Sequence, residues 1–484
     1  MLFNSIEFAI FYVIVTFLYF ILPFKSKWLL LLLASCYFYM AFVPMYILIL
    51  GFTIVIDYLA GIYIEKCEGQ KRKTLLIISL FTNIGVLFFF KYFNFVSLNI
   101  SKLFEDSNYG GPAPYLTVLL PIGLSFHTFQ AMSYTIEVYR GNQKAERHFG
   151  IYSLYVMFYP QLVAGPIERP QNLLHQFYID HKFDEKLMTS GLRLMAWGLF
   201  KKVVIADRLA IVVNQIFDAP EKHTSLNLIV AVFYFSFQIY CDFSGYSDMA
   251  IGAARTMGFK LMKNFDAPYQ SKSISEFWQK WHISLSTWFK DYLYIPMGGN
   301  RVNVPRWYLN LFIVFLLSGL WHGANWTFVA WGVLHGLYLI FETITKKARK
   351  RIADILDIGK VNILSVIFTF ALVTFAWIFF RAQNIDIAVY IVKKVVLGIP
   401  EAVAQLLHGK LDLINLGGSW SSLIVSFALI CFLEVIEFLK KRFHLIKRFE
   451  ESPATIRWGT YYILVLVILT MGVFNQSQFI YFRF

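Results

Sequence analysis

The amino-acid sequence predicts an all-α fold, a polytopic bundle of transmembrane helices. Hydrophobic residues make up 58% of the 484 residues and charged residues only 15%, whereas soluble domains contain about 45–50% apolar and about 25% charged residues. A chain of this composition cannot cover itself with a water-soluble surface. Aromatic residues reach 19%, an excess that suits lipid-facing Phe and interfacial belts of Tyr and Trp.

Long segments without Asp, Glu, Lys or Arg support this fold class. A helix needs about 20 apolar residues to cross a bilayer, and several segments meet that length alone. Their apolar residues are continuous and do not alternate, which indicates helices and not the strands of a barrel. The segments are 8–24, 28–56, 74–90, 107–136, 224–241, 307–341, 361–380, 413–433 and 459–482.

Basic residues predict the orientation of the chain in the membrane. The net charge of +14 does not indicate nucleic acid, because Lys and Arg gather in cytoplasmic loops of membrane proteins. Placing the basic clusters inside puts both chain ends on the outer side. The clusters lie at 25–27, 66–73, 140–147, 346–351 and 440–448.

Two middle segments depart from a simple spanning pattern. Residues 150–170 are apolar but carry Pro160, Gly165 and Pro166, so we expect a re-entrant or broken segment buried in protein or lining a cavity. Residues 264–306 are too charged to span and should lie against the membrane on the cytoplasmic side. Within them, Ser273 and Glu276 have the spacing of a helix-starting capping box.

His322 is the first candidate for chemistry. It lies in SGLWHGANW, inside the stretch 307–341, which contains no Asp, Glu, Lys or Arg. Titratable side chains within a membrane-spanning segment are rare, and they usually face a cavity or the interior of the helical bundle. Burial keeps imidazole neutral, and a neutral imidazole is a competent general base. The alternative is a histidine that only bonds a neighbouring carbonyl.

Two further polar sites are candidates. His282 lies in an aromatic segment with Trp278, Trp281 and Trp288, which alternatively serves only to anchor the chain at the membrane interface. Asp242 lies in QIYCDFSGYSDMAIG, where it forms either a pocket wall or a hydrogen bond between helices. The chain has no G-x-S-x-G, Walker A or H-E-x-x-H motif, so we expect no metal site.

Taken in order along the chain, five motifs resemble the membrane-bound O-acyltransferase (MBOAT) family, and within it the bacterial alginate O-acetylation branch. The resemblance treats residues 1–484 as a single membrane domain with a motif core at about 115–340, and the C-terminal QFIYFRF is similar to that branch too. The motifs are PIGLSFHTFQAMSY, YPQLVAGPIERP, YCDFSGYSDMAIG, FWQKWHISLSTWFKDYLYIPMGGNR and GLWHGANWTFVAWGVLHG.

The resemblance implies a helical bundle around a central tunnel and transfer of an acyl group from a thioester to a hydroxyl. It places the family's hallmark histidine on His322 and a second motif position on His282. It implies no bound cofactor, acetyl-CoA or another acyl thioester as donor, and periplasmic or membrane-anchored partner proteins of an exported polysaccharide.

The supporting groups follow from chemistry. An oxyanion needs hydrogen-bond donors, for which Asn325 and the indoles of Trp321 and Trp281 are candidates. The donor's phosphates need basic residues, for which Lys280 and Arg301 are candidates, together with Lys201, Lys202 and Lys290.

Several other functions remain open from the sequence. Within the family, the alternatives are D-alanyl transfer to teichoic acid and O-acetylation of peptidoglycan. Outside it, a transporter would use the same broken helices and buried polar groups, and a non-catalytic scaffold for polysaccharide export would make His322 dispensable.

The positive-inside pattern generates a test of topology. Single cysteines introduced into the loops at 65–73, 140–149 and 345–351 should react with a membrane-impermeant maleimide only after cell lysis, because these basic loops stay in the cytoplasm. Cysteines at the two termini should react in intact cells. Labelling of 345–351 in intact cells would refute the topology.

Overall fold

The computed structural model describes residues 1–103, 114–117, 121–163, 165–355, 362–408, 419–474 and 479–480, and all the regular secondary structure in these ranges is helical. Eight helices there are long and apolar enough to cross a membrane, which confirms the predicted polytopic all-α class, and Ile6–Ile21 is apolar but shorter. The eight are Tyr46–Lys66, Gly69–Leu103, Ser225–Thr256, Val304–His322, Trp326–Arg351, Ile363–Arg381, Trp420–Arg442 and Ala454–Met471.

The chain forms two compact units, Met1–Met195 with Tyr246–Lys263, and Ala196–Gly245 with Asn264–Phe484. The helices α10 (Glu185–Leu199) and α12 (Ser225–Thr256) contribute residues to both. The other elements of the first unit are α1 (Ile6–Ile21), α2 (Phe24–Met40), α3 (Tyr46–Lys66), α4 (Gly69–Leu87), η1 (Phe88–Tyr92), α5 (Phe93–Leu103), α6 (Leu124–Arg140), α7 (Phe149–Met157), α8 (Tyr159–Leu162), α9 (Pro170–Leu173) and η2 (Leu174–Tyr178).

The second unit holds both histidines that the sequence singles out. Its elements are η3 (Phe200–Ala206), α11 (Asp207–Asp218), η4 (Pro220–Lys222), η5 (Pro268–Gln270), α13 (Ile274–Lys280), α14 (Ile283–Phe289), η6 (Lys290–Tyr294), α15 (Val304–His322), α16 (Trp326–Ile355), α17 (Asn362–Arg381), α18 (Ile385–Leu397), α19 (Ile399–Leu407), α20 (Trp420–Arg442), α21 (Leu445–Glu450) and α22 (Ala454–Met471).

The segment predicted to be broken is broken. Helix α7 ends at Met157, Phe158 takes an extended ψ of 110°, and the four-residue helix α8 follows. The residues 151–163 are buried, so the interrupted backbone lies inside protein. That is the setting in which irregular backbone is tolerated at membrane depth.

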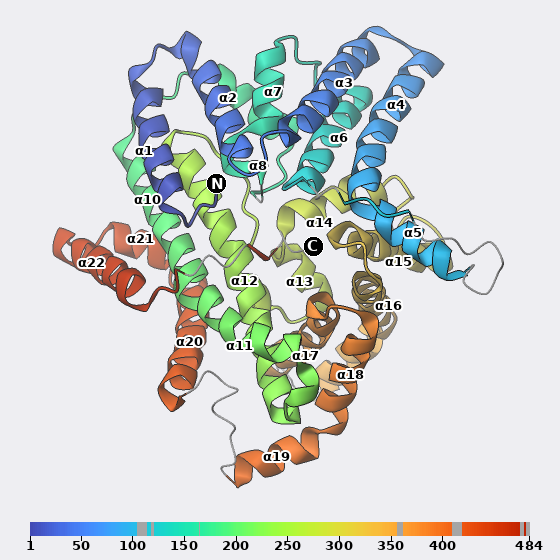
Figure 1. Cartoon of the computed structure of the whole chain (residues 1–484), viewed down its shortest axis with the longest axis vertical. Helices are drawn as coiled ribbons and strands as arrows, with labels where there is room; N and C mark the ends of the chain where they lie inside the picture. The colour runs from blue at the N-terminus through green and yellow to red at the C-terminus, as the bar shows by residue number, and fades with distance from the viewer. Residues whose placement is uncertain are drawn as a thin grey trace. The chain divides into compact units, whose positions relative to one another are not determined.

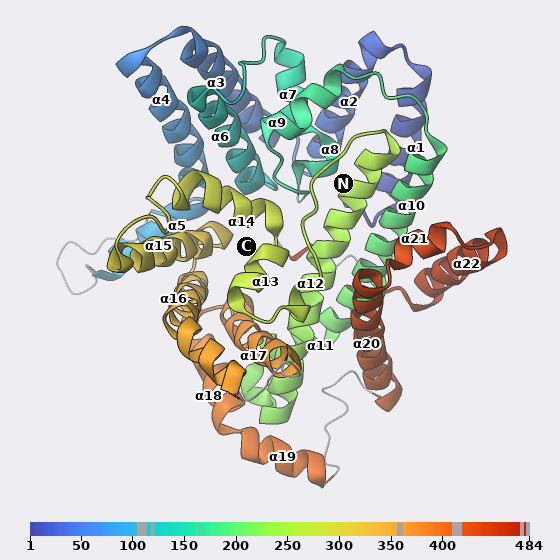
Figure 2. The same cartoon turned by 180° about the vertical axis from the view of Figure 1, so that it is seen from behind.

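A buried carboxylate joins α3, α4 and α6, which lie side by side in Figures 1 and 2. Asp57 is fully buried and accepts a hydrogen bond from the Ser79 hydroxyl at 2.6 Å and from the Asn83 amide at 2.9 Å. Ser79 also lies 3.1 Å from the Thr135 hydroxyl. Because apolar surface gives little drive for helix association in lipid, such polar contacts fix which helices meet.

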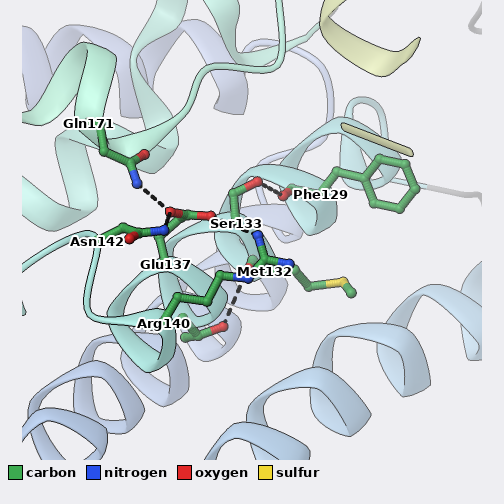
Figure 3. A network of polar contacts seen from close by, with 8 residues as sticks. Phe129, Met132, Ser133, Glu137, Arg140, Asn142 and Gln171 are labelled. Carbon is green, nitrogen blue, oxygen red and sulfur yellow. Dashed lines mark hydrogen bonds and ion pairs between the residues drawn. The ribbon is translucent and has the colours of Figure 1, made fainter. Parts of the chain in front are cut away.

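The C-terminal end of α6 is closed by a second polar network (Figure 3). Glu137 accepts hydrogen bonds from Asn142 and Gln171 and pairs with Arg140. Gly141 follows the helix with φ of 78°, the left-handed conformation in which glycine commonly ends helices. The basic loop after α6 is therefore built on a fixed turn.

Close backbone contact joins α15 and α16. A Cβ atom on Gly319 would lie 2.3 Å from the Phe328 carbonyl oxygen, and one on Gly332 would lie 2.4 Å from that of Phe315. Only glycine leaves room for the two backbones to approach this closely. The pairing holds the last turn of α15, and with it His322, against α16.

The Asp57 network predicts a graded loss of stability. Asp57→Leu should lower the midpoint of thermal unfolding in detergent, because Ser79 and Asn83 would be left with buried donors at a cost of about 1–3 kcal/mol. Asp57→Asn should lose less, since its amide oxygen still accepts. Equal midpoints for Asp57→Leu and wild type would show that the network does not hold the helices together.

Candidate active site

The two candidate histidines are both neighbours of one tryptophan, Trp321, in the second unit. The ring centroids of His282 and Trp321 are 6.2 Å apart, and those of Trp321 and His322 are 4.9 Å apart. Both histidines are buried, with exposed fractions of 0% and 3%. Segments 40 residues apart in the sequence thus both contact Trp321.

His322 is the last residue of α15. Its ring meets the edges of Trp331 and Phe380, with centroids 5.0 and 5.2 Å apart. Gly323 ends the helix in an extended conformation, and a Cβ there would lie 2.1 Å from the Phe328 ring. The glycine that follows the histidine is therefore required for close packing, and the imidazole occupies a largely aromatic setting.

The Asn325 amide is engaged away from the histidine. Its Nδ2 donates to the carbonyl of Gln383 at 2.9 Å, and its Oδ1 accepts from the backbone N–H of Thr327 at 3.1 Å. In this arrangement the side chain holds the start of α16. Oxyanion stabilisation by Asn325 would require these two contacts to change.

His282 occupies the turn between α13 and α14 with φ 44° and ψ 55°. This left-handed conformation is uncommon outside glycine and is often found at functional sites. Its Nδ1 lies 3.2 Å from Oδ1 of Asn264. Burial lowers the pKa of His282 to about 3, so the ring is neutral near pH 7 and its unprotonated nitrogen can accept a proton.

The aromatic segment around His282 is packed inside the protein. Trp278, Trp281 and Trp288 are all buried, and the Trp281 ring contacts Phe277 and Trp377 at centroid distances of 5.5 and 5.1 Å. The interpretation of this segment as a lipid anchor is therefore wrong for these three indoles. Their bulk encloses the cluster instead.

The predicted capping box at the start of α13 is half formed. Ser273 accepts from the backbone N–H of Glu276 at 3.1 Å, as predicted. The Glu276 carboxylate, however, accepts from the backbone of Lys272 and pairs with Lys280. The backbone N–H of Ile274 donates to Glu342, which satisfies an otherwise open group at the helix start.

Asp242 belongs to a buried ion cluster. Its carboxylate lies 2.8 Å from the ammonium of Lys202, which also pairs with Asp207 at 2.8 Å. Burial would lower the pKa of Lys202, but the two carboxylates raise it above its ordinary value. Asp242 also accepts from the backbone N–H of Ile480 at 2.8 Å, so it ties the C-terminal segment to α12.

The basic residues proposed for donor phosphates fall into two groups. Lys202 is committed to carboxylates, Lys201 donates to Ser244 at 2.8 Å, and Lys280 is paired with Glu276. Lys290 and Arg301 are exposed. The sequence could not separate these groups, because burial of a lysine depends on partners distant in the chain.

Sequence reasoning singled out Trp321 but missed Asn264 and the contacts of His322 with Trp331 and Phe380. Asn264 precedes His282 by 18 residues and carries no motif of its own. Of the C-terminal QFIYFRF, only Phe479 and Ile480 are among the described residues.

Comparison with known sequences matches residues 146–382 to the membrane-bound O-acyltransferase family. The chain is 40% identical over 377 residues to a probable alginate O-acetylase of Pseudomonas aeruginosa, covering 77% of this chain and 70% of that protein. It is 37% identical over 434 residues to a peptidoglycan O-acetyltransferase of Helicobacter pylori, covering 82% and 80%. A teichoic acid D-alanyltransferase of Bacillus subtilis is 26% identical over 274 residues, covering 54% and 69%. A buried histidine pair in a polytopic helical chain and relatives of this similarity agree: the chain belongs to the membrane-bound O-acyltransferase family and is an O-acyltransferase.

Proposed function

We propose that this enzyme transfers an acetyl group from acetyl-CoA to a hydroxyl of an exported polysaccharide of the alginate type. The observation that carries the proposal is the buried cluster of His282, Trp321 and His322. Relatives named as alginate O-acetylases favour this acceptor. We place the enzyme in a bacterial cytoplasmic membrane with both termini outside, as the basic loops favour.

The reaction exchanges a thioester for an ester. His322 takes the proton of the acceptor hydroxyl, and the oxygen attacks the thioester carbonyl. The tetrahedral intermediate collapses with loss of the thiolate, which receives the proton from His322. No net proton is consumed. A general base typically contributes about 10²–10⁴ in rate, and His322 is 3% exposed among the rings of Trp331 and Phe380.

We assign the second catalytic position to His282, beside the donor thioester. The ring is neutral, since burial lowers its pKa to about 3. The indole of Trp321 neighbours both imidazoles and is the candidate donor to the oxyanion. A dry aromatic surrounding also protects the thioester from hydrolysis.

Delivery to the polysaccharide implies partners on the outer side of the membrane. The donor is a cytoplasmic metabolite and the acceptor is exported, so the acyl group must cross the bilayer. We propose that a periplasmic or membrane-anchored protein receives it. Exposed Lys290 and Arg301 are the candidates to meet the donor's phosphates.

Peptidoglycan is the second candidate acceptor, because the peptidoglycan O-acetyltransferase of Helicobacter pylori is similar over 82% of this chain. Acetyl content of purified peptidoglycan and of the exported polysaccharide, measured in a deletion strain and its complemented form, separates the two acceptors.

His322→Ala should abolish acetylation while the protein remains folded and inserted. His322→Gln should be equally inactive, because an amide keeps hydrogen bonding but cannot take up the proton. The measurement is ester-linked acetate on the polysaccharide, together with free thiol released from acetyl-CoA by purified enzyme. The rate should fall by at least about 10²-fold.

His127→Gln is the matched control. His127 is 1% exposed, lies in the first unit and contacts Thr53 at 2.6 Å. The variant therefore replaces a buried histidine by glutamine outside the cluster. It should stay active. A scaffold would keep normal acetylation with His322→Ala, and a transporter would change flux without changing thiol release. Either result would remove the catalytic assignment.

A further inference from the structure

The turn that carries His282 is clamped by a single asparagine. The Asn264 carbonyl accepts from the backbone N–H of Ile283 at 2.9 Å. Its side-chain Oδ1 accepts from the backbone N–H of Ser284 at 3.3 Å and from the Ser284 hydroxyl at 2.9 Å. Asn264 is 1% exposed, and His282 and Ser284 are fully buried. Main chain and side chain of one residue thus hold the turn.

These contacts decide which end of the amide faces the imidazole. Oxygen and nitrogen of an asparagine are assigned from their hydrogen bonds. A backbone N–H can only donate, so the atom that meets the Ser284 backbone N–H must be the oxygen. The same oxygen lies 3.2 Å from Nδ1 of His282. The Ser284 hydroxyl lies 3.4 Å from the same nitrogen, but it is closer to Asn264 Oδ1, to which it donates at 2.9 Å. With the hydroxyl proton on Oδ1, an unprotonated Nδ1 would face two acceptors, so these contacts favour a proton on Nδ1.

We propose that Asn264 is a positioning residue that fixes His282 in the Nδ1–H tautomer, with its lone pair at Nε2. Neutral imidazole holds a donor at one nitrogen and an acceptor at the other. His282 then accepts a proton or a hydrogen bond at Nε2 from one of the two substrates. It does not donate a hydrogen bond from Nε2 to polarise the thioester carbonyl. This inference rests on the proposed role of His282.

The surroundings of the ring favour this state. Phe243, Phe265 and Trp321 lie against the imidazole at centroid distances of 4.7, 6.5 and 6.2 Å. None of these carries a charge, and neither do Asn264 and Ser284.

Charged groups on the neighbouring segments are neutralised by their own partners. Asp242, next to Phe243, is paired with Lys202, and Lys280, two residues before His282, is paired with Glu276. On the segment of Asn264 itself, Lys263 and Asp266 are also charged, so a charge introduced at position 264 would add to the effect of these two groups on the imidazole.

Asn264→Asp and Asn264→Ala test the inference together. Both Asp oxygens accept, so Asp keeps the tautomer, but its charge stabilises imidazolium and raises the pKa of His282. At pH 8 the Asp variant should retain most of the wild-type kcat, whereas Ala should lose at least about tenfold with little change in KM. A neighbouring carboxylate shifts a pKa by about 1–3 units, so the Asp variant should lose activity as the pH falls from about 7 to about 5 and His282 gains a proton, whereas the wild type should not.

Asn310→Asp is the matched control for a buried charge. Asn310 is fully buried, and its Nδ2 donates to the carbonyls of Met297 and Gly299. This variant should be less stable than wild type, and its rate should keep the wild-type dependence on pH.

Histidine ¹⁵N chemical shifts give a readout independent of turnover. In selectively labelled protein, the resonance lost in His282→Gln should show Nδ1 protonated in wild type and a mixture of tautomers in Asn264→Ala. An Nε2–H tautomer in wild type would overturn the inference, and so would an Asn264→Asp rate profile that coincides with that of wild type. If the His282→Ala variant retains full activity, the proposed catalytic role of His282 fails. The ¹⁵N shifts then still decide which tautomer His282 adopts.

Discussion

The contact between α15 and α16 at Gly319 and Gly332 sets the position of everything around His322. The two helix backbones approach so closely that a Cβ atom on either glycine would overlap a carbonyl oxygen of the other helix. This contact fixes the register of α15 against α16. That register places Trp331 against the imidazole at the end of α15. A larger residue at either glycine would separate the helices and move the histidine relative to its aromatic partners.

Polar groups inside this apolar chain serve two different ends. In the Asp57 network the members bond to each other, and in the Lys202 cluster the opposite charges pair with each other. Each group therefore holds its helices together. The histidines His282 and His322 lie instead among aromatic rings. An aromatic surrounding keeps an imidazole neutral, and the same surrounding keeps water from a reactive thioester. Packing and chemistry thus require the same residues.

The sequence predicted the fold class because apolar runs define helices locally. His322 was singled out in the same way, as a titratable residue within such a run, whereas His282 was singled out by its motif, and the catalytic roles of both stay predictions. The break at Phe158 and the Ser273 cap followed from proline, glycine and serine positions in the same way. Asn264 could not be predicted, because its meaning depends on a turn 18 residues later. Equally, nothing in the sequence shows that Lys202 faces Asp242 and not a phosphate, since their 40-residue separation is closed only by the fold.

The bond from Ile480 to Asp242 has a consequence for the order of assembly during synthesis. The two residues are 238 positions apart. At bacterial elongation rates of about 5–20 residues per second, roughly 10–50 s pass between their translation. During that interval α12 is already made, but Asp242 Oδ2 lacks the hydrogen bond from the backbone N–H of Ile480. Phe479, the neighbour of Ile480, lies 5.8 Å from Phe243, whose ring lies beside His282. The packing around Phe243 is therefore completed only after the 238 residues that separate the two segments have been made.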